Sequence, residues 1–244
     1  MSLPAEGLDH EATALPIGGA ALVRLGEAPP LGALSSVFQT ESLDLVTMDP
    51  SAIYGPAPVP RPVLIVWMPV SSPEELLRAI VAWRDRSEKV HPVALLGCAP
   101  GASAGEVERV LAAGFDDFVG PVVSPREIAA RVRALARRVE SSVRIASARL
   151  RTSIFSLDLG AYALWIGGRS VRLTPTEMQL MRTLVAANGR TLTREELLDA
   201  VWGGDNLEVG LRAVDNLVWR LRRKAGDSQI IVTVRGAGFR LSER

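Results

Sequence analysis

Side chains that commonly perform catalysis are few in this sequence, and their order along the chain argues against a hydrolase. Gly101, Ser103 and Gly105 match the G-x-S-x-G pattern, in which a serine nucleophile lies between two glycines. In that class of enzyme the histidine follows the serine, whereas His10 and His91 both precede it. We therefore expect Ser103 to lie in a small-residue loop that caps a helix, and we predict that the protein is not an enzyme.

Metal and nucleotide chemistry also lack the residues that they need. Two distant histidines and one cysteine, Cys98, do not supply the clustered ligands of a zinc site. No G-x-x-x-x-G-K-[ST] motif is present to hold the phosphates of a nucleotide, so we expect neither a cofactor nor a metal. The lone cysteine suits a reducing cytoplasm. Because no apolar run approaches the roughly 18 residues of a membrane span, and no secretory signal begins the chain, we expect a cytoplasmic protein without membrane contact.

Charge is distributed unevenly between the two halves of the chain. Residues 1–140 hold 12 Lys/Arg and 17 Asp/Glu, a net charge of −5, whereas residues 141–244 hold 16 and 10, a net charge of +6. An acidic front and a basic back indicate a regulatory or assembly module joined to a module that binds a polyanion.

One segment near the C-terminus concentrates cations on a helical pattern. Residues 212–224 hold five Lys/Arg against a single acidic residue, Asp215. At 100° per residue, one side is the apolar stripe of a core-facing helix, made by Val214, Leu217, Val218 and Leu221. The opposite side carries Arg212, Asn216, Trp219 and Arg223, flanked by Arg220 and Arg222. A charged face is often merely solvated, but clustered arginines with an asparagine and a large aromatic favour nucleic-acid binding.

The elements around this helix predict a winged helix-turn-helix. Thr174–Glu177 and Thr193–Glu196 each place a hydroxyl three residues before a glutamate, which is the signature of a helix start. Residues 154–174 alternate apolar and polar positions around a Gly167-Gly168 turn and predict antiparallel strands. Residues 230–241 predict a hairpin with Arg235 at a glycine-rich tip. In this motif the second helix enters the major groove and the wing reaches the minor groove.

The N-terminal half alternates buried strands with helices, which predicts an α/β fold with a doubly wound parallel sheet. The predicted strands are Ala20–Leu25, Leu43–Val46, Val63–Trp67, Val93–Leu96 and Phe118–Val119. The predicted helices are Pro30–Phe38, Pro73–Arg86, Ala104–Ala113 and Pro125–Glu140, with Ser72 and Ser124 as N-caps of the second and fourth. Five prolines from Asp49 to Pro62 argue against a normal crossover helix there.

These patterns divide the chain into four parts. We expect a loosely ordered tail at 1–17, an α/β domain at 18–140, a polar and basic linker at 141–152, and a small α+β domain at 153–244.

The C-terminal domain resembles the winged helix-turn-helix domain of the OmpR/PhoB family of response regulators. The resemblance covers residues 154–241 and rests on "LTPTEMQLMRTL", "GRTLTREELLDAVWG", "RAVDNLVWRLRRKAG" and "TVRGAGFRL". It implies double-stranded DNA as the partner. It implies contacts with phosphates or sugars for Trp202, Arg212, Trp219, Arg222 and Thr233, base-edge contacts for Asp215, Asn216 and Arg220, and a minor-groove contact for Arg235. Arg223 completes the predicted surface. Arginine suits guanine and asparagine suits adenine, whereas the uncharged indole of Trp219 departs from a phosphate ligand.

The N-terminal half resembles the family's receiver domain most clearly at Val110–Arg138, which implies a flavodoxin-like sheet. A receiver needs an acidic pair after its first strand, an aspartate at the end of its third, a hydroxyl after its fourth and a lysine after its fifth. This chain has Leu25-Gly26, Trp67-Met68, Gly97 and Pro121 at those positions. We therefore expect a degenerate phosphorylation pocket, with no aspartyl phosphorylation and no Mg²⁺.

The family also pairs its receivers through charged residues on the last helices and strand. The resemblance places Arg109, Asp117, Glu127 and Arg131 near that face and implies a homodimer, although exposed ion pairs alone contribute only about 0–1 kcal/mol. Such a dimer would bind two half-sites about one helical turn apart.

Three functional hypotheses follow. The first is a phosphorylation-independent transcription regulator, in which the loop "WGGDNLEVGL" could touch RNA polymerase. The second is a sensor whose receiver-like domain binds a small apolar ligand between Leu25, Trp67, Met68 and Cys98. The third is conventional phosphorylation at another acid, Glu27 or Asp117.

Overall fold

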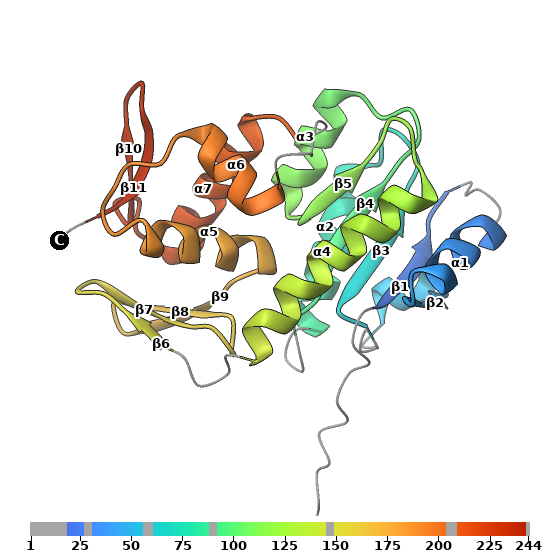
Figure 1. The fold of residues 1–244 in the computed structure, drawn as a ribbon, viewed down its shortest axis with the longest axis horizontal. Helices are drawn as coiled ribbons and strands as arrows, with labels where there is room; N and C mark the ends of the chain where they lie inside the picture. Colours follow the sequence, from blue (N-terminus) through green and yellow to red (C-terminus); the bar gives the residue numbers. More distant parts are fainter. Residues whose placement is uncertain are drawn as a thin grey trace, which may run out of the picture.

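A computed structural model describes residues 19–26, 31–55, 61–87, 92–144, 149–203 and 209–242. The predicted N-terminal tail, Glu27, both histidines and residues 204–208 of the predicted polymerase-facing loop lie outside these described residues. Two bodies of secondary structure lie side by side, a parallel sheet with its helices and a smaller C-terminal body with two antiparallel sheets (Figure 1).

The N-terminal body is a doubly wound parallel sheet, as the strand and helix pattern predicts. Its strands run in the order β2-β1-β3-β4-β5. They are β1 (Gly19–Arg24), β2 (Asp44–Met48), β3 (Val63–Trp67), β4 (Ala94–Cys98) and β5 (Asp117–Val119). The helices are α1 (Leu31–Thr40), α2 (Glu74–Ser87), α3 (Ala104–Ala113) and α4 (Pro125–Arg144). This strand order is that of the flavodoxin-like fold.

Helices cover both faces of the sheet, because successive side chains of each buried strand point to opposite faces. On one face Leu22, Ile65 and Trp67 pack with Phe38 of α1 and Val132 of α4. On the other face Val23, Leu64 and Val66 pack with Leu77 of α2 and Val107 of α3.

The proline-rich connection between β2 and β3 has no α-helix in its described part. A short 3₁₀-helix, η1 (Pro50–Tyr54), begins at Asp49, whose carboxylate accepts a hydrogen bond from the Ser51 amide at 2.8 Å. The prediction from the prolines is confirmed for residues 49–55, and residues 56–60 lie outside the described part.

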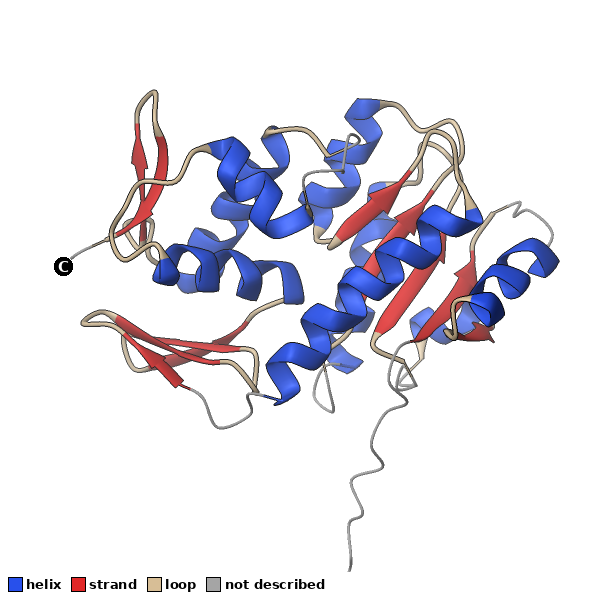
Figure 2. Cartoon of the chain, in the orientation of Figure 1, coloured by secondary structure: helices blue, strands red, loops and turns tan. Residues whose placement is uncertain are grey.

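The C-terminal body is built from a four-stranded antiparallel sheet, three helices and a hairpin (Figure 2). The sheet contains β6 (Arg149–Arg151), β7 (Phe155–Asp158), β8 (Ala163–Ile166) and β9 (Arg169–Arg172). The helices are α5 (Pro175–Ala186), α6 (Arg194–Trp202) and α7 (Arg212–Ala225), and the hairpin is β10 (Ile231–Val234) with β11 (Gly238–Leu241). These elements form the predicted winged helix-turn-helix.

Residues 141–152, predicted as a linker, carry regular structure at both ends. Helix α4 continues to Arg144, four residues beyond the predicted end, and β6 pairs with β7 as an edge strand of the C-terminal sheet. A polar composition does not exclude such structure, because an edge strand and the last turn of a helix both tolerate polar residues.

Three of the capping predictions are confirmed and one, at Ser72, is wrong. Thr174 and Thr193 form capping boxes with Glu177 and Glu196, as predicted. Ser103 also caps α3, which confirms the capping interpretation of the small-residue loop. The predicted Ser72 cap is not what the structure shows, because the Ser72 hydroxyl donates to the carbonyl of Pro69 at 2.8 Å.

Candidate nucleic-acid interface

Helix α7 is amphipathic in the predicted sense. Its apolar side, which includes Val214, Leu217, Val218 and Leu221, is buried in the core of the C-terminal body. The side chain of Trp219 is 57% exposed on the opposite side, and Arg223 stacks on its ring with the guanidinium carbon 5.3 Å from the ring centroid. Stacking on a cation gives the indole a positively charged neighbour, which suits a surface that meets phosphates.

The wing is fixed to α7 by Arg222 and to the segment before α6 by backbone hydrogen bonds. Arg222 donates to the Thr233 hydroxyl at 2.8 Å and to the Ile231 carbonyl at 3.0 Å from Nε. Leu192 and Phe239 exchange backbone hydrogen bonds of 2.8 and 2.9 Å. Arg235 is exposed at the tip of the hairpin, where the wing of this motif meets DNA.

Asp215, predicted to face base edges, is engaged by a residue that the sequence reasoning missed. Arg194 donates to both carboxylate oxygens of Asp215, the shortest contact being 2.8 Å, and lies 4.8 Å from the centroid of the Phe239 ring. The hydrogen bond to Asp215 raises the pKa of Arg194. Its position directly after the N-cap Thr193 gave no sequence signal for this pairing. Asn216 is half-buried beside Asp215.

Three predicted DNA ligands point toward the N-terminal body. Arg212 Nη1 lies 3.3 Å from the carboxylate of Glu108 on α3. Arg220 Nη1 donates to the carbonyl of Leu111 at 2.8 Å, and its side chain is only 10% exposed. Trp202 is buried, and its indole donates to the carbonyl of Asp116 at 2.9 Å.

Asp116, which the sequence reasoning did not single out, joins the two bodies. Its carboxylate accepts from the Thr176 hydroxyl at 2.6 Å and the Thr176 amide at 3.1 Å. The other oxygen accepts from the Leu95 amide at 3.0 Å and lies 3.5 Å from Arg84 Nη1. Asp116 and Arg84 are both almost fully buried, so this ion pair depends on its hydrogen-bonded surroundings. The only sequence signal was an acidic pair next to a buried strand.

Glu177 of α5 is a buried carboxylate that pairs with two cations of α7. Lys224 Nζ lies 2.8 Å from one carboxylate oxygen, and Arg220 Nε lies 4.0 Å from the other. Burial acts to raise the pKa of Glu177, but Lys224 and Arg220 outweigh it and hold this pKa below its usual value. Burial lowers the pKa of Arg220, against the opposing effects of Glu177 and Asp116.

The position of the receiver's phosphorylation pocket is filled by apolar atoms. A Cβ added at Gly97 would lie 2.8 Å from the Phe118 ring and 3.4 Å from the Met68 methyl group. A Cβ at Gly26 would lie 3.1 Å from the Pro69 ring. The cavity beside Met68 measures about 10 Å³. Strand β5 ends at Val119, so Gly120 and then Pro121 follow it, and neither carries an amine.

The residues proposed to line a ligand site do not share a pocket. Trp67 and Cys98 belong to the core on the α1 and α4 face, whereas Met68 and Leu25 pack with the core on the other face. The sheet separates them, because the strand alternation that buries Trp67 sends Met68 the other way. The four-residue site predicted for a small apolar ligand is therefore wrong.

Three of the four predicted dimerisation residues form one chain of ion pairs. Arg131 lies 3.6 Å from Asp117 and 3.2 Å from Glu127. Asp117 is almost completely buried, which removes it from the surface on which a phosphoryl donor would act. Arg109 is separate from them and donates to the Ser72 carbonyl at 2.6 Å.

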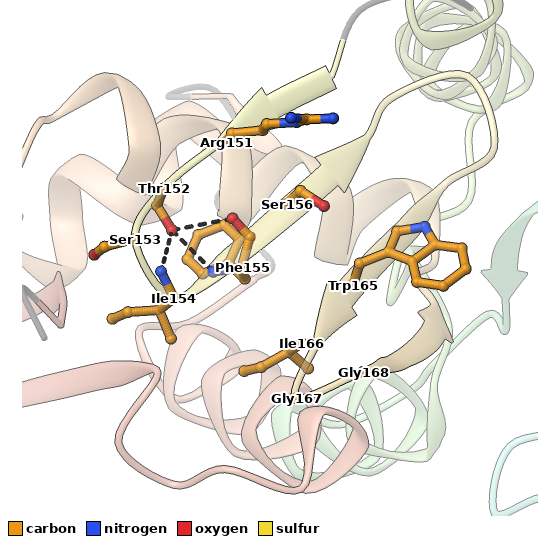
Figure 3. A pocket seen from close by; sticks show the side chains of 10 residues that line it. All are labelled: Arg151, Thr152, Ser153, Ile154, Phe155, Ser156, Trp165, Ile166, Gly167 and Gly168. Atoms are coloured by element: carbon orange, nitrogen blue, oxygen red, sulfur yellow. Dashed lines mark hydrogen bonds between the residues drawn. The ribbon is translucent and has the colours of Figure 1, made fainter.

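An open pocket of about 330 Å³ lies on the four-stranded sheet, away from these residues. It is bordered by the turn after β6 and by the Gly167-Gly168 turn, and Trp165 is exposed at its side (Figure 3). The Thr152 hydroxyl holds this turn by donating to the Phe155 carbonyl at 3.1 Å. None of its lining residues is a predicted site residue.

Comparisons with known proteins agree with this architecture. A family model described as "Transcriptional regulatory protein, C terminal" matches residues 168–241. The phosphate regulon transcriptional regulatory protein PhoB of Rhizobium meliloti is 39% identical over 189 residues, which cover 75% of this chain and 79% of that protein. The response regulator MprA of Mycobacterium bovis is 34% identical over 209 residues, 83% of each chain. A solved structure of a RitR mutant covers 93% of this chain and 100% of its own with a TM-score of 0.64; at 20% identity it shows the fold alone.

A flavodoxin-like sheet followed by a winged helix-turn-helix is the architecture of a response regulator with a DNA-binding effector domain. The alignment with PhoB of Rhizobium meliloti, at 39% identity, covers three quarters of the chain. The chain belongs to the OmpR/PhoB family of response regulators, which are transcriptional regulators. None of the helices in the described parts of the chain is long and apolar enough to cross a membrane.

Proposed function

We propose that this response regulator binds specific double-stranded DNA sequences without aspartyl phosphorylation. The observation that carries the proposal is the filled pocket around Gly97. A hydroxyl-bearing side chain at Gly97 would meet Phe118 and Met68, an acidic side chain at Gly26 would meet Pro69, and Met68 itself stands at the acceptor position. Tightly packed interiors do not accommodate such groups without rearrangement.

The DNA-reading surface in this proposal is the outward face of α7 together with the wing. Exposed Trp219, Arg223 and Arg235 provide aromatic and cationic contacts to the DNA backbone and minor groove. Asn216 and Arg220 carry the side chains that pair with adenine and guanine edges. The +6 charge of residues 141–244 supports association with a polyanion.

We infer further that the protein acts as a homodimer through the receiver-like domain, with a cytoplasmic location and RNA polymerase as a second partner. Asp117, Glu127 and Arg131 form ion pairs within one protomer, and the proposed dimer surface is the one that carries them. Glu127 is about one third exposed and could pair across an interface. Two protomers would place two α7 helices on half-sites about one helical turn apart.

A selection experiment tests the DNA-binding proposal. The full-length chain is used to enrich binding sequences from a pool of random duplexes, with and without acetyl phosphate or beryllofluoride. We expect one enriched motif of two half-sites, the same affinity under all conditions, and an unchanged intact mass. A phosphoryl adduct, or a motif that appears only with the phosphoryl donor, would contradict phosphorylation independence. Absence of any enriched motif would contradict sequence-specific binding.

A further inference from the structure

The outer face of the four-stranded sheet carries an exposed aromatic side chain in the middle of a cross-strand row. Strand pairing aligns Arg151, Ser156, Trp165 and Ser170 across β6, β7, β8 and β9. Because side chains alternate along a strand and align across it, these four point to the same face of the sheet. Leu164, the neighbour of Trp165 along β8, is completely buried. The row that contains Trp165 therefore lies on the solvent side.

The same face has an excess of positive charge. The next cross-strand row contains Arg149, Asp158, Ala163 and Arg172. Arg149 Nε lies 3.1 Å from the Asp158 carboxylate, so the charges of this pair offset each other. Arg151 and Arg172 are both exposed, and Asp158 is the one acidic residue in the two rows. The two rows thus carry a net positive charge that attracts an anionic partner.

Small neighbours leave the ring of Trp165 open to a ligand. Its cross-strand partners are Ser156 and Ser170, and its side chain is 46% exposed. Figure 3 shows Ser156 between Arg151 and Trp165, at the pocket of about 330 Å³. Since neighbouring strands lie about 4.8 Å apart, the backbones of Arg151 and Trp165 are about 10 Å apart, within the combined reach of two long side chains. A planar ring stacked on the indole would therefore have a guanidinium close to it.

We propose that this face binds single-stranded nucleic acid, with an unpaired base stacked on Trp165 and the adjoining phosphates held by Arg151 and Arg172. Aromatic platforms beside cationic side chains are the usual means of binding a single strand. A base inside a duplex cannot stack on the indole, because neighbouring base pairs cover both of its faces. An acidic peptide would satisfy the arginines but would leave the indole without a stacked ring.

This site is separate from the proposed duplex-binding surface. Leu164 of the sheet and Leu217 of α7 are both buried in the core of the C-terminal body. The opposite sides of these two elements, which carry Trp165 and Trp219, therefore point away from that core on different elements. A duplex on α7 and a single strand on the sheet do not compete for the same side chains, so this inference does not depend on duplex binding.

Reciprocal substitutions of the two exposed tryptophans test the site in the full-length chain. The probe is a labelled oligothymidylate of about 12 nucleotides, which does not pair with itself, and its Kd is measured by fluorescence anisotropy. We expect Trp165→Thr to raise this Kd at least about fivefold, and Trp165→Phe to raise it less because a ring remains. Threonine is favoured in strands, so the sheet should stay folded. Trp219→Phe should weaken duplex binding but leave oligothymidylate binding within about twofold of the unmodified protein.

The contributions of base and phosphate can be measured separately. An oligomer of the same length in which every base is replaced by an abasic site keeps the phosphates, and should bind the unmodified protein and Trp165→Thr equally weakly. Arg151→Ala should reduce the slope of log Kd against log salt concentration by about 0.7 for oligothymidylate. Arg78→Ala removes an exposed arginine from α2 in the other body and is the matched control, with an unchanged slope.

Quenching by acrylamide locates the bound strand. In the Trp219→Phe protein, Trp165 is the remaining exposed tryptophan, because the other three are each at most 5% exposed, namely Trp67, Trp83 and Trp202. Oligothymidylate at saturation should protect Trp165 from the quencher. The abasic oligomer should give less protection.

The outcomes separate this inference from the proposed duplex binding. Equal affinities for the base-bearing and abasic oligomers would overturn it, as would a loss of oligothymidylate binding in Trp219→Phe but not in Trp165→Thr. Displacement of the oligomer by polyglutamate at a matched concentration of charge would assign the face to acidic peptides and overturn it as well. Binding of oligothymidylate that depends on Trp165, in a protein that selects no duplex, would support this inference and contradict the proposed function alone.

Discussion

Trp202 and Asp116, 86 residues apart, are joined by a 2.9 Å hydrogen bond from the indole to the backbone carbonyl in a buried environment. Asp116 precedes the edge strand of the N-terminal sheet, and Trp202 ends the first helix of the helix-turn-helix. The resemblance to the OmpR/PhoB family implies a DNA contact for Trp202. In the structure the same donor instead stabilises contact between the two bodies.

Replacing this tryptophan distinguishes the two roles. Trp202→Phe keeps an aromatic ring and removes the donor, which should weaken the contact between the two bodies by about 1 kcal/mol without lowering the affinity for DNA. Trp219→Phe, on the exposed face of α7, should lower it. Fluorescence anisotropy with a labelled random duplex measures both. A fall in affinity for Trp202→Phe as large as that for Trp219→Phe would show that Trp202 contributes mainly to DNA contact.

Arg220 and Arg212 should differ in what they contribute to sequence preference. With the operator found by selection, Arg220→Ala should relax preference at one base position, since a bidentate contact discriminates by about 1–3 kcal/mol. Arg212→Ala should weaken binding to all sequences alike. It should also reduce the slope of log Kd against log salt concentration by about one. Titrations against single-base operator variants measure both effects. Identical preference profiles for the two proteins would contradict a base-reading role for Arg220.

Stability should depend on pH through Glu177. Its pKa in the folded protein is lowered by Lys224 and Arg220 despite burial, so its ionised form stabilises the fold above its unfolded pKa of about 4.3. That contribution is lost as pH falls below this value through the folded pKa. Glu177→Gln should cost about 2–4 kcal/mol at pH 7, because it leaves buried positive charge uncompensated. Denaturant unfolding from pH 7 to pH 3 should show the difference between the two proteins shrinking only below about pH 4.5. A constant difference would contradict the ion pair.

The wing depends on a glycine at its base. A Cβ on Gly238 would lie 1.9 Å from the Leu192 carbonyl oxygen, and its φ is 140°. Gly238→Ala should therefore break the Leu192–Phe239 pairing, cost about 2–4 kcal/mol and weaken DNA binding by displacing Arg235. Gly236→Ala is the matched control, because its φ of 73° gives strain of only about 1–2 kcal/mol while no atom lies within 4 Å of the added Cβ. Equal thermal stability of the two variants would exclude the predicted clash.

Local patterns in the sequence were sufficient for the order and type of the elements. The apolar runs that became β1, β3 and β4, the capping boxes at Thr174 and Thr193, and the apolar stripe of α7 all arise from interactions within a few residues. Such signals can be read directly from the spacing of apolar and polar residues, because a helix repeats every 3.6 residues and a strand every two. They also located the surface that carries Trp219, Arg223 and Arg235.

The pairing of distant groups was decided only by the tertiary structure. Nothing in the local residue pattern indicated that Arg194 binds Asp215. Nor did it indicate that Asp116 accepts from Thr176 and Trp202. Arg220 looks like a solvated helix cation in the sequence, and only contact with α3 removes it from water. These contacts join segments tens of residues apart, so the residue types permit them but only the packing of the two bodies brings them together.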